Sequence, residues 1–363
     1  MLAVFFENSV GNPRTINYNI DTKGGLCLMK KILIISPNYQ EDKCYVWINQ
    51  VKDSSHFKGS VAFDYISPDT QISENVTLYD CLAIKEMLCQ TDLSCYEGML
   101  LIHGTEYIPF TAAALNLLLT HVTIPLVIIT QNALLGQRSS FRMECFAAAV
   151  TFIRSVRLPG VYNIIKNELS QTLEVHYGSR ISQKAPFDFQ YIDMISGRFG
   201  EIANDTFQFL HGIGNPSVKS LTSMPRSISG MKTAANVMFI RSYRRMPYHY
   251  YNFARSKPDA VLQELFDVTS ILNNEGLHSL TAFSEHCRQH DVPLYLCPLV
   301  HENLDYGEVF APVLKNGAVL IRNTTVFSAY AKLVYGYGDG NYRQYLDTDF
   351  AFEHFSPEVL SAK

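Results

Sequence analysis

The chain has 363 residues, of which 30 are basic and 34 acidic, so its formal net charge is −4. Hydrophobic residues make up 47% of the sequence and charged residues 18%, which excludes a disordered chain, because disorder requires low hydrophobicity and high net charge. The small acidic excess provides no basic surface for a nucleic acid, and the length predicts two domains of roughly 150 residues each.

Residues 1–28 form a mostly polar extension without the basic and apolar regions of a signal peptide. Codons for Lys23-Gly24-Gly25 can form a ribosome-binding site a short distance before Met29. We therefore hypothesise that Met29 is the natural start and that residues 1–28 need not be native.

The eight cysteines show no CxxC pair and no zinc-type spacing with histidine. This pattern favours free thiols in a reducing, cytoplasmic compartment, and it gives no reason to expect a metal or another cofactor. No run of 18 uncharged apolar residues occurs, so we expect no membrane span and no membrane partner.

From Met29 onward, short apolar runs alternate with longer segments of helical spacing. Such alternation predicts βαβ units and a mostly parallel sheet with helices on both faces. The predicted strands are Lys31–Ser36, Val61–Ile66, Gly98–His103 and Pro125–Thr130, and the predicted helices are Tyr79–Leu88, Phe110–His121 and Phe141–Val156.

The segment His211–Gly230 is rich in Gly, Ser, Pro and Asn and predicts a linker, to which we assign residues 201–232. A second α/β pattern follows it, so we expect an N-terminal domain at 29–200 and a smaller one at 233–363. Its predicted strands are Val237–Arg241, Ala260–Phe266, Pro293–Cys297 and Ala318–Ile321, and its predicted helices are Leu277–His290 and Val326–Tyr335.

Four loops follow the predicted strands of the first domain, at the sheet edge where open α/β folds bind ligands. They are Ser36–Glu41, Gln71–Thr77, His103–Tyr107 and Gln131–Ser139. The third holds His103, Thr105 and Glu106 between a buried strand and a helix start, where backbone N–H groups favour anions. Ordinary capping of the helix by Thr105 and Glu106 is the alternative interpretation.

Two long stretches of the chain are YEGMLLIHGTEYIPFTAAALNLLLTHVTIPLVIITQ and a second that begins at HDVPLYLCPLV. They resemble the bacterial-type L-asparaginase family, and the first matches the family's HGTD segment and its surroundings. Two intermediate stretches match in order, so the resemblance covers nearly all of residues 29–340. It implies the two-domain α/β fold of that family, with a larger N-terminal mostly parallel sheet, and a homodimer or homotetramer with sites between subunits.

The resemblance also implies that the family's first-loop nucleophile has been lost. That nucleophile is the second threonine of a TGGTI motif, whereas this chain reads Ser36-Pro37-Asn38-Tyr39-Gln40. The position falls on Tyr39 or Gln40, and neither can form the acyl-enzyme that a threonine hydroxyl forms. Ser36 is the nearest hydroxyl of the right kind, but its place at the strand end favours a capping or hydrogen-bonding role.

The second part of the family's apparatus is a Thr-Asp-Lys constellation. The resemblance places Thr105 on its threonine, as nucleophile or proton relay, and Glu106 on its aspartate, as the contact for the substrate's amine. The lysine position falls on Gln183, with Lys184 one residue on, so Lys184 can act as the activator only if a β-bulge restores its direction.

Other family positions correspond to residues of the second loop and of the second domain. The family's substrate serine corresponds to Ser73, with Glu74 beside it. We therefore expect Ser36, Tyr39, Gln40, Ser73 and Glu74 to line the substrate site. A further family motif reads Asn323-Thr324-Thr325, for which we expect a helix cap.

Two other patterns have structural interpretations that we favour. The stretch Arg241–Lys257 interleaves basic and aromatic residues like a single-strand nucleic-acid platform, but the net charge favours a structural or subunit-contact loop. A less favoured interpretation is that Arg244 or Arg245 binds a small acidic ligand. His286 and His290 are one helical turn apart, and we expect them to be solvated or capping rather than metal ligands.

Three functions remain open from the sequence. The first is a divergent amidohydrolase or acyl-transfer enzyme for a small amide or amino-acid derivative, with Thr105, Glu106 and Lys184 as catalytic residues. The second is an inactive protein of the same fold that binds an amino-acid-like ligand. The third is a structural subunit that binds a protein partner.

Overall fold

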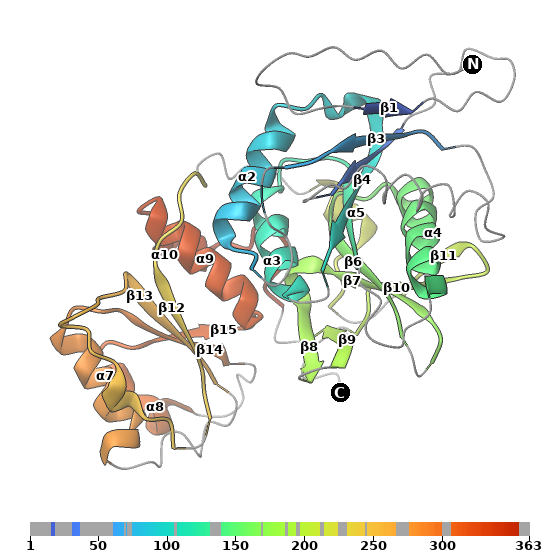
Figure 1. Ribbon diagram of the computed structural model, residues 1–363. Helices are drawn as coiled ribbons and strands as arrows, with labels where there is room; N and C mark the ends of the chain where they lie inside the picture. Colours follow the sequence, from blue (N-terminus) through green and yellow to red (C-terminus); the bar gives the residue numbers. More distant parts are fainter. Residues whose placement is uncertain are drawn as a thin grey trace, which may run out of the picture.

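The computed structural model shows two α/β domains side by side, with the N-terminal domain built on the larger sheet (Figure 1). It describes residues 16–18, 31–36, 61–68, 70, 75–104, 107–130, 139–167, 170–185, 188–193, 197–210, 214–223, 231–243, 245–265, 276–299 and 306–355.

The large sheet has nine strands in the order β1-β3-β2-β4-β5-β6-β7-β10-β11. Its centre, from β3 to β6, is parallel, and antiparallel strands extend it at both ends. Apolar runs such as KILII and PLVIIT form the central strands because both faces of this part of the sheet are covered. The strands are β1 (Ile16–Tyr18), β2 (Lys31–Ile35), β3 (Phe63–Ile66), β4 (Tyr96–His103), β5 (Pro125–Thr130), β6 (Gly160–Lys166), β7 (Leu173–Tyr177), β10 (Gly200–Ala203) and β11 (Thr206–Phe209).

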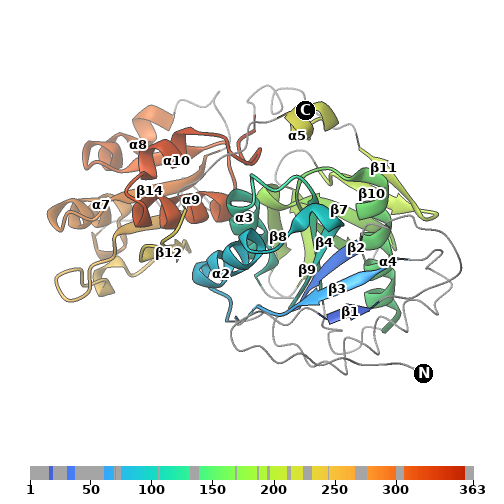
Figure 2. The same cartoon turned by 90° about the horizontal axis from the view of Figure 1, so that it is seen from above.

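Helices cover the large sheet on its two faces. On one face α2 (Leu78–Cys89) and α3 (Ile108–Leu118) contribute to one hydrophobic cluster, and α4 (Ser139–Val156) contributes to a second cluster on the other face. Figure 2 shows α4 on the opposite side of the strands from α2 and α3. A short α5 (Val218–Ser223) follows the last strand.

The small domain has a parallel four-stranded sheet in the order β12-β13-β14-β15. Helices α7 and α8 pack on one face through Phe283 and Phe310, and α9 lies on the other face, toward the large domain. The elements are β12 (Val237–Arg241), β13 (Ala260–Glu264), α7 (Leu280–Gln289), β14 (Leu294–Leu299), α8 (Tyr306–Lys315), β15 (Val319–Arg322), α9 (Val326–Gly338) and α10 (Tyr342–Asp347).

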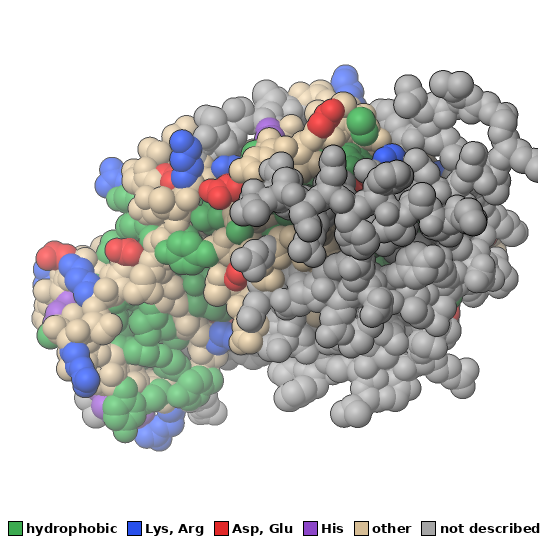
Figure 3. Space-filling view, turned by 45° about the horizontal axis from the view of Figure 1, so that its top comes forward, with side chains coloured by type: hydrophobic (Ala, Val, Ile, Leu, Met, Phe, Trp, Pro, Cys, Tyr) green, Lys and Arg blue, Asp and Glu red, His purple; other side chains and the backbone are tan. Residues whose placement is uncertain are grey.

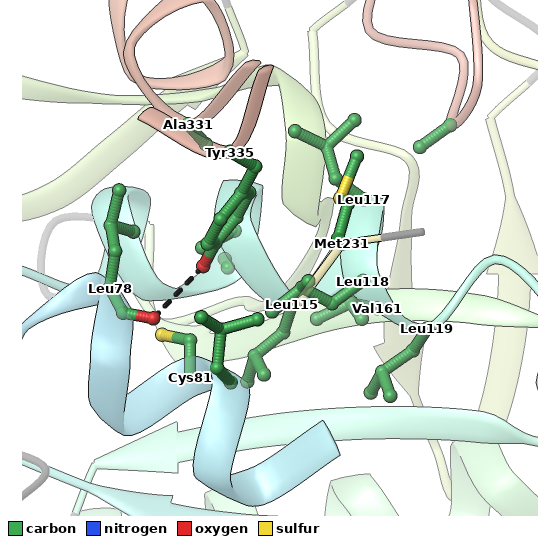
Figure 4. Close-up of a cluster of buried hydrophobic side chains, with 14 of the residues drawn as sticks. Leu78, Cys81, Leu115, Leu117, Leu118, Leu119, Val161, Met231, Ala331 and Tyr335 are labelled. Carbon is green, nitrogen blue, oxygen red and sulfur yellow. Dashed lines mark hydrogen bonds between the residues drawn. The ribbon is translucent and has the colours of Figure 1, made fainter. Parts of the chain in front are cut away.

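One hydrophobic cluster is shared by the two domains. Helix α9 of the small domain packs on α3 of the large one, and the buried side chains of both helices belong to this cluster together with those of α2. The Tyr335 hydroxyl donates a hydrogen bond of 3.2 Å to the Leu78 carbonyl across the junction (Figure 4). The fixed position of the small domain therefore follows from burial of α9 against α3.

Most of the predicted elements are confirmed, with ends that differ by a few residues. The sequence does not predict β6, β7, β10 or β11, nor the separate hairpin of β8 (Ile181–Ala185) and β9 (Asp188–Asp193). Part of the segment assigned to a linker instead forms β10 and β11 at the edge of the large sheet. The exact domain boundaries stay a prediction.

The N-terminal extension contributes a strand to the large sheet. Ile16–Tyr18 pairs antiparallel with β3, with Ile16 opposite Tyr65 and Tyr18 opposite Phe63. This pairing covers the backbone edge of β3, which is a hazard for association when it is left open.

A chain that starts at Met29 is expected to lose this edge strand. Loss of three strand pairs lowers the free energy of unfolding by about 1 kcal/mol and exposes β3 to other chains. Denaturant titration and light scattering measure both effects, with a chain that starts at residue 12 as the control. An equal free energy of unfolding and an equal association state for the two shortened chains would contradict the pairing.

Candidate functional site

The candidate site lies where the central strands of the large sheet end. His103, the last residue of β4, pairs with Thr130, the last residue of β5. On the other side, the backbone N–H of buried Ser36, just after β2, donates a 3.1 Å hydrogen bond to the carbonyl of Ile66, the last residue of β3. The four candidate loops therefore leave the sheet from one edge.

The His103 side chain is fully buried and bonded at both ring nitrogens. Nδ1 lies 2.8 Å from the Gly104 carbonyl oxygen and Nε2 lies 2.9 Å from the Thr111 hydroxyl. Because a carbonyl oxygen only accepts, Nδ1 carries a hydrogen, and in the neutral ring Nε2 accepts from Thr111. His103 thus ties the start of its loop to the first turn of α3, and this is a positioning role.

The HGTEY loop ends at Tyr107, which is exposed and has the left-handed φ of 59° directly before α3. Arg241, at the end of β12 in the small domain, is close enough for Tyr107 to contribute to its raised pKa. The main cause of that shift is the Glu264 carboxylate, which accepts a 2.6 Å hydrogen bond from the Arg241 Nε. The carboxyl edge of the small sheet therefore approaches the same loop.

Strand β8 carries both candidates for the family's lysine position. Gln183 pairs with Tyr191 and Ala185 with Asp188, so two residues of β9 oppose the single residue Lys184. This irregularity is a bulge whose extra residue lies in β9, and bulges increase the local twist. The side chains of Gln183 and Lys184 lie outside the described part of the structure, and the role of Lys184 stays a prediction.

The short 3₁₀ helix Gly178–Arg180, which we label η2, leads directly into β8. Residues 348–355, which we call the strap, cross over it. The Ser179 hydroxyl donates to the Ala351 carbonyl at 2.8 Å, and the Arg180 Nε donates to the Phe352 carbonyl at 2.6 Å. The large domain is therefore bonded to the strap immediately before β8.

A buried ion pair holds the strap on α9. Lys332 Nζ lies 2.5 Å from Glu353 Oε1, and both side chains are fully buried. Lys332 also donates to the Thr348 carbonyl at 2.7 Å and to His354 Nε2 at 2.8 Å. Glu353 in turn accepts a 2.6 Å hydrogen bond from the Ala351 N–H.

Titration of the strap is shifted by its burial and by its charges. Burial, and then the neighbouring Glu353, raise the pKa of Asp349 to about 7. Burial acts on Glu353 in the same direction, but the Lys332 ammonium and a hydrogen bond from Asp349 outweigh it and lower the pKa of Glu353. Burial and Lys332 lower the pKa of His354. The raised pKa therefore keeps the proton on Asp349 below about pH 7, while Glu353 stays ionised beside Lys332.

Most of the sequence-predicted site residues fall outside the described part of the chain. These are Tyr39, Gln40, Ser73, Glu74, Thr105 and Glu106. Ser36 is described, and it is buried at the end of β2 as expected. Ser179, Arg180, Lys332 and Glu353 were missed, because nothing in their local sequence marks them.

The other expectations concern histidines and helix caps. His290 is the C-cap of α7, and its Nδ1 lies 3.0 Å from the His286 carbonyl oxygen, as expected for a capping residue. Thr325 caps α9 by accepting from the Ser328 N–H. Within the described residues no group of three potential ligands is arranged for a metal ion. None of the described helices combines the length and the apolar character needed to cross a membrane.

Comparison of the sequence with known proteins gives a match to one family model and to several relatives. Residues 35–212 match the family model described as asparaginase, N-terminal. A glutamyl-tRNA(Gln) amidotransferase subunit from Methanococcus maripaludis is 24% identical over 179 residues, which are 47% of this chain and 40% of the relative. The same subunit from a second strain is 26% identical over the same length. The chain thus spans about two fifths of the length of these curated relatives.

Comparison of the structures supports the fold over nearly the whole chain. The thermostable L-asparaginase from Thermococcus kodakarensis has a TM-score of 0.66 at 15% identity, covering 90% of this chain and 99% of that one. L-asparaginase I from Vibrio cholerae has a TM-score of 0.65 at 15% identity, with the same coverage. At this identity the likeness shows the two-domain fold.

The contact between His103 and Thr111 generates a stability prediction. Thr111→Val leaves the buried Nε2 of His103 without its hydroxyl partner and is expected to lower the free energy of unfolding by about 1–3 kcal/mol. Thr120→Val is the matched control, because the buried Thr120 hydroxyl has no hydrogen-bond partner in the described structure. Denaturant unfolding compares the two. Equal losses would show that the contact contributes nothing.

The raised pKa of Asp349 predicts a dependence of stability on pH. The folded state holds a proton that the unfolded state releases above pH 4, so the stabilisation is complete below that pH and is lost as pH rises through 7. Asp349→Asn keeps a donor toward Glu353 at every pH.

The variant should match the original chain near pH 4 and exceed its free energy of unfolding by about 1–3 kcal/mol at pH 8. Thermal or denaturant unfolding across this range measures the difference. Two curves that stay parallel from pH 4 to pH 8 would refute the raised pKa of Asp349.

Proposed function

We propose that this chain, which belongs to the asparaginase family through residues 35–212, is a divergent amidohydrolase or acyl-transfer enzyme for a small amide or amino-acid derivative. The observation that carries the proposal is the HGTE sequence at 103–106, which begins at the last residue of the central strand β4 and precedes the buried helix α3. In open α/β sheets, ligands bind at the loops that follow the carboxyl ends of the strands.

The proposed roles follow from the chemistry of the side chains. Thr105 attacks the carbonyl carbon of the amide, Lys184 takes its proton and passes it to the leaving nitrogen, and ammonia departs. Water, or an acceptor amine in a transfer reaction, then releases the acyl group from Thr105. Glu106 binds the substrate's ammonium group, since its carboxylate is the nearest anion in the sequence.

The geometry around the loop supports these roles. His103 is fixed by two hydrogen bonds, so the backbone that leads to Thr105 starts from a rigid point. The hydrogen bond between Ser36 and Ile66 holds together the starts of the loops that carry Tyr39, Gln40, Ser73 and Glu74. We propose these residues, with Ser36, as the substrate-binding wall.

The relatives from Methanococcus maripaludis suggest the transfer alternative. They are named as a subunit of an amidotransferase, and the match covers less than half of each chain. Acyl transfer and hydrolysis share the first step, in which an amide is cleaved and a covalent acyl group forms. We therefore keep both outcomes for the second step.

The second candidate function is an inactive protein of this fold that binds an amino-acid-like ligand or a protein partner. The observation in its favour is the first loop, where Pro37, Tyr39 and Gln40 stand at the place of a glycine-rich nucleophile segment. Proline lacks a backbone donor, and tyrosine and glutamine carry side chains where glycines would let the backbone approach a substrate.

We also propose a cytoplasmic homodimer or homotetramer without nucleic-acid or membrane partners. The described cysteines are free, as expected in a reducing compartment. Figure 3 shows hydrophobic side chains gathered on one face of the small domain. Exposed aromatic residues of that domain include Tyr243 and Tyr250, the latter 76% exposed, which suits a subunit contact for the loop Arg241–Lys257.

The direct test is ammonia release from L-asparagine, L-glutamine and a panel of small amides. Thr105→Ala should lower kcat by at least about 100-fold, whereas Thr105→Ser keeps a hydroxyl and should retain measurable activity. Lys184→Met should cause a similar loss, and Gln183→Met, the matched control on the neighbouring residue, should not.

Two results would overturn the assignment. Activity that survives Thr105→Ala excludes Thr105 as nucleophile, and loss with Gln183→Met but not Lys184→Met moves the activator to the family register. Complete inactivity of the original chain, with a rise in Tm when an amino acid is added, establishes the binding function instead.

A further inference from the structure

Helix η2 is the place where the two domains and the strap meet. Gly178 is pressed between β6 and α3, since an added Cβ would lie 2.9 Å from the Val161 carbonyl oxygen and 3.1 Å from that of Ala112. Glycine is therefore the only residue that fits there without a shift of the backbone. The start of η2 is fixed by this contact.

The next residue, Ser179, binds the small domain and the strap together. Its carbonyl accepts hydrogen bonds from the Thr325 hydroxyl at 3.2 Å and the Ser328 hydroxyl at 2.7 Å, both at the start of α9. Its own hydroxyl donates to the Ala351 carbonyl of the strap at 2.8 Å. All four residues are buried.

Arg180 binds three backbone carbonyls in this joint. Its guanidinium donates to the carbonyl oxygens of Phe352 at 2.6 Å, His354 at 3.3 Å and Gly214. Three carbonyls in different directions suit the planar, five-donor guanidinium and not the compact ammonium of lysine. Only 6% of Arg180 is exposed, so these bonds are not exchanged for water.

The carbonyls that Arg180 binds are held in place by the ion pair beneath them. Glu353 lies between Phe352 and His354 in the chain and accepts from the backbone N–H groups of Phe350 and Ala351. Lys332 of α9 binds the Glu353 carboxylate, and both side chains are fully buried. The Glu353 carboxylate thus holds the backbone of the strap in a turn whose carbonyl groups accept hydrogen bonds from η2.

We propose that Arg180 is a positioning residue, which fixes the base of β8 to the strap and so sets where residues 183 and 184 stand relative to the HGTE loop. The inference rests on the proposed function, in which β8 supplies the amine. Lys184 lies four residues beyond Arg180, about 13 Å along an extended strand. A tilt of about 5° at the base moves it by about 1 Å, enough to cost roughly 100-fold in rate.

The test compares Arg180→Met and Arg180→Lys with Arg198→Met. Arg198 is a matched control, because it is a partly buried arginine of the same domain whose guanidinium pairs with Glu174 and Glu201 of β7 and β10. Glu353→Gln loosens the strap without touching η2 and keeps the inference testable if Arg180 variants fold poorly.

Two measurements on the full chain do not require catalysis. The first is hydrogen exchange of the backbone amides of 181–185, with the amides of β6 as the internal reference. The second is the rate of acetylation of Lys184 by acetic anhydride from pH 6 to pH 11, followed by peptide mass spectrometry. The pH profile reports the environment of the amine, which a change in overall stability alone does not move.

Arg180→Met should speed exchange in β8 by about tenfold over β6 and shift the midpoint of Lys184 acetylation by about half a pH unit. Arg180→Lys and Glu353→Gln should show smaller shifts in the same direction, and Arg198→Met none. Where the chain releases ammonia, kcat should fall in Arg180→Met while KM stays within about twofold.

The proposal is overturned if Arg180→Met changes β8 exchange and the Lys184 profile no more than Arg198→Met does. It is also overturned if exchange rises but the acetylation profile stays in place, because Arg180 then has only a structural role. Absence of ammonia release in the original chain counts against the proposed enzyme, and the two labelling measurements still decide the role of Arg180.

Discussion

The burial of helix α3 is the constraint on which the rest of the structure depends. The helix IPFTAAALNLL is apolar on nearly every side, and ten of its eleven residues are buried. A helix of this composition needs cover on both sides. The large sheet covers one side and α9 of the small domain covers the other, so one cluster of side chains determines both the domain arrangement and the place where the HGTE loop enters α3.

Hydrogen bonds of buried polar side chains then fix the positions of α3 and α9 relative to their neighbours. His103 bonds the loop to α3 at the sheet edge, and the Asn116 side-chain oxygen accepts from the Val161 N–H where α3 meets β6. On the small-domain side, Ser179 bonds the start of α9. Buried polar groups of this kind contribute little net free energy but penalise other arrangements strongly, because each would leave an unpaired donor or acceptor. The candidate site is therefore built on rigid supports.

The sequence predicts the central part of the fold well and its margins poorly. Strands such as KILII are buried on both faces, so their apolar runs are plain in the sequence. The antiparallel edge strands β10 and β11 are missed because their exposure is mixed, as in TFQF of β11, where every residue is at least partly exposed. The sequence did contain one local signal for this hairpin, the pair Asn204-Asp205. Asn and Asp tolerate positive φ, and both residues adopt it in the two-residue turn between β10 and β11.

The site is predictable only where its residues share a loop or a family motif. The HGTE sequence can be recognised from its place between a buried strand and a helix. The strap cannot be recognised in this way, because the hydrogen bond from Arg180 to the Phe352 carbonyl joins residues 172 positions apart, and no local pattern relates them. Lys332 likewise looks like a solvated residue of an amphipathic helix until Glu353 is placed above it.

The measurement that tests the central assignment most directly is covalent trapping of the nucleophile. An α-diazoketone analogue of asparagine loses nitrogen when a hydroxyl attacks it and leaves a stable ether, whose position peptide mass spectrometry identifies. The account predicts the label on Thr105 and its loss in Thr105→Ala. A label on Ser36, Tyr39 or another residue, or one that persists in Thr105→Ala, would contradict it.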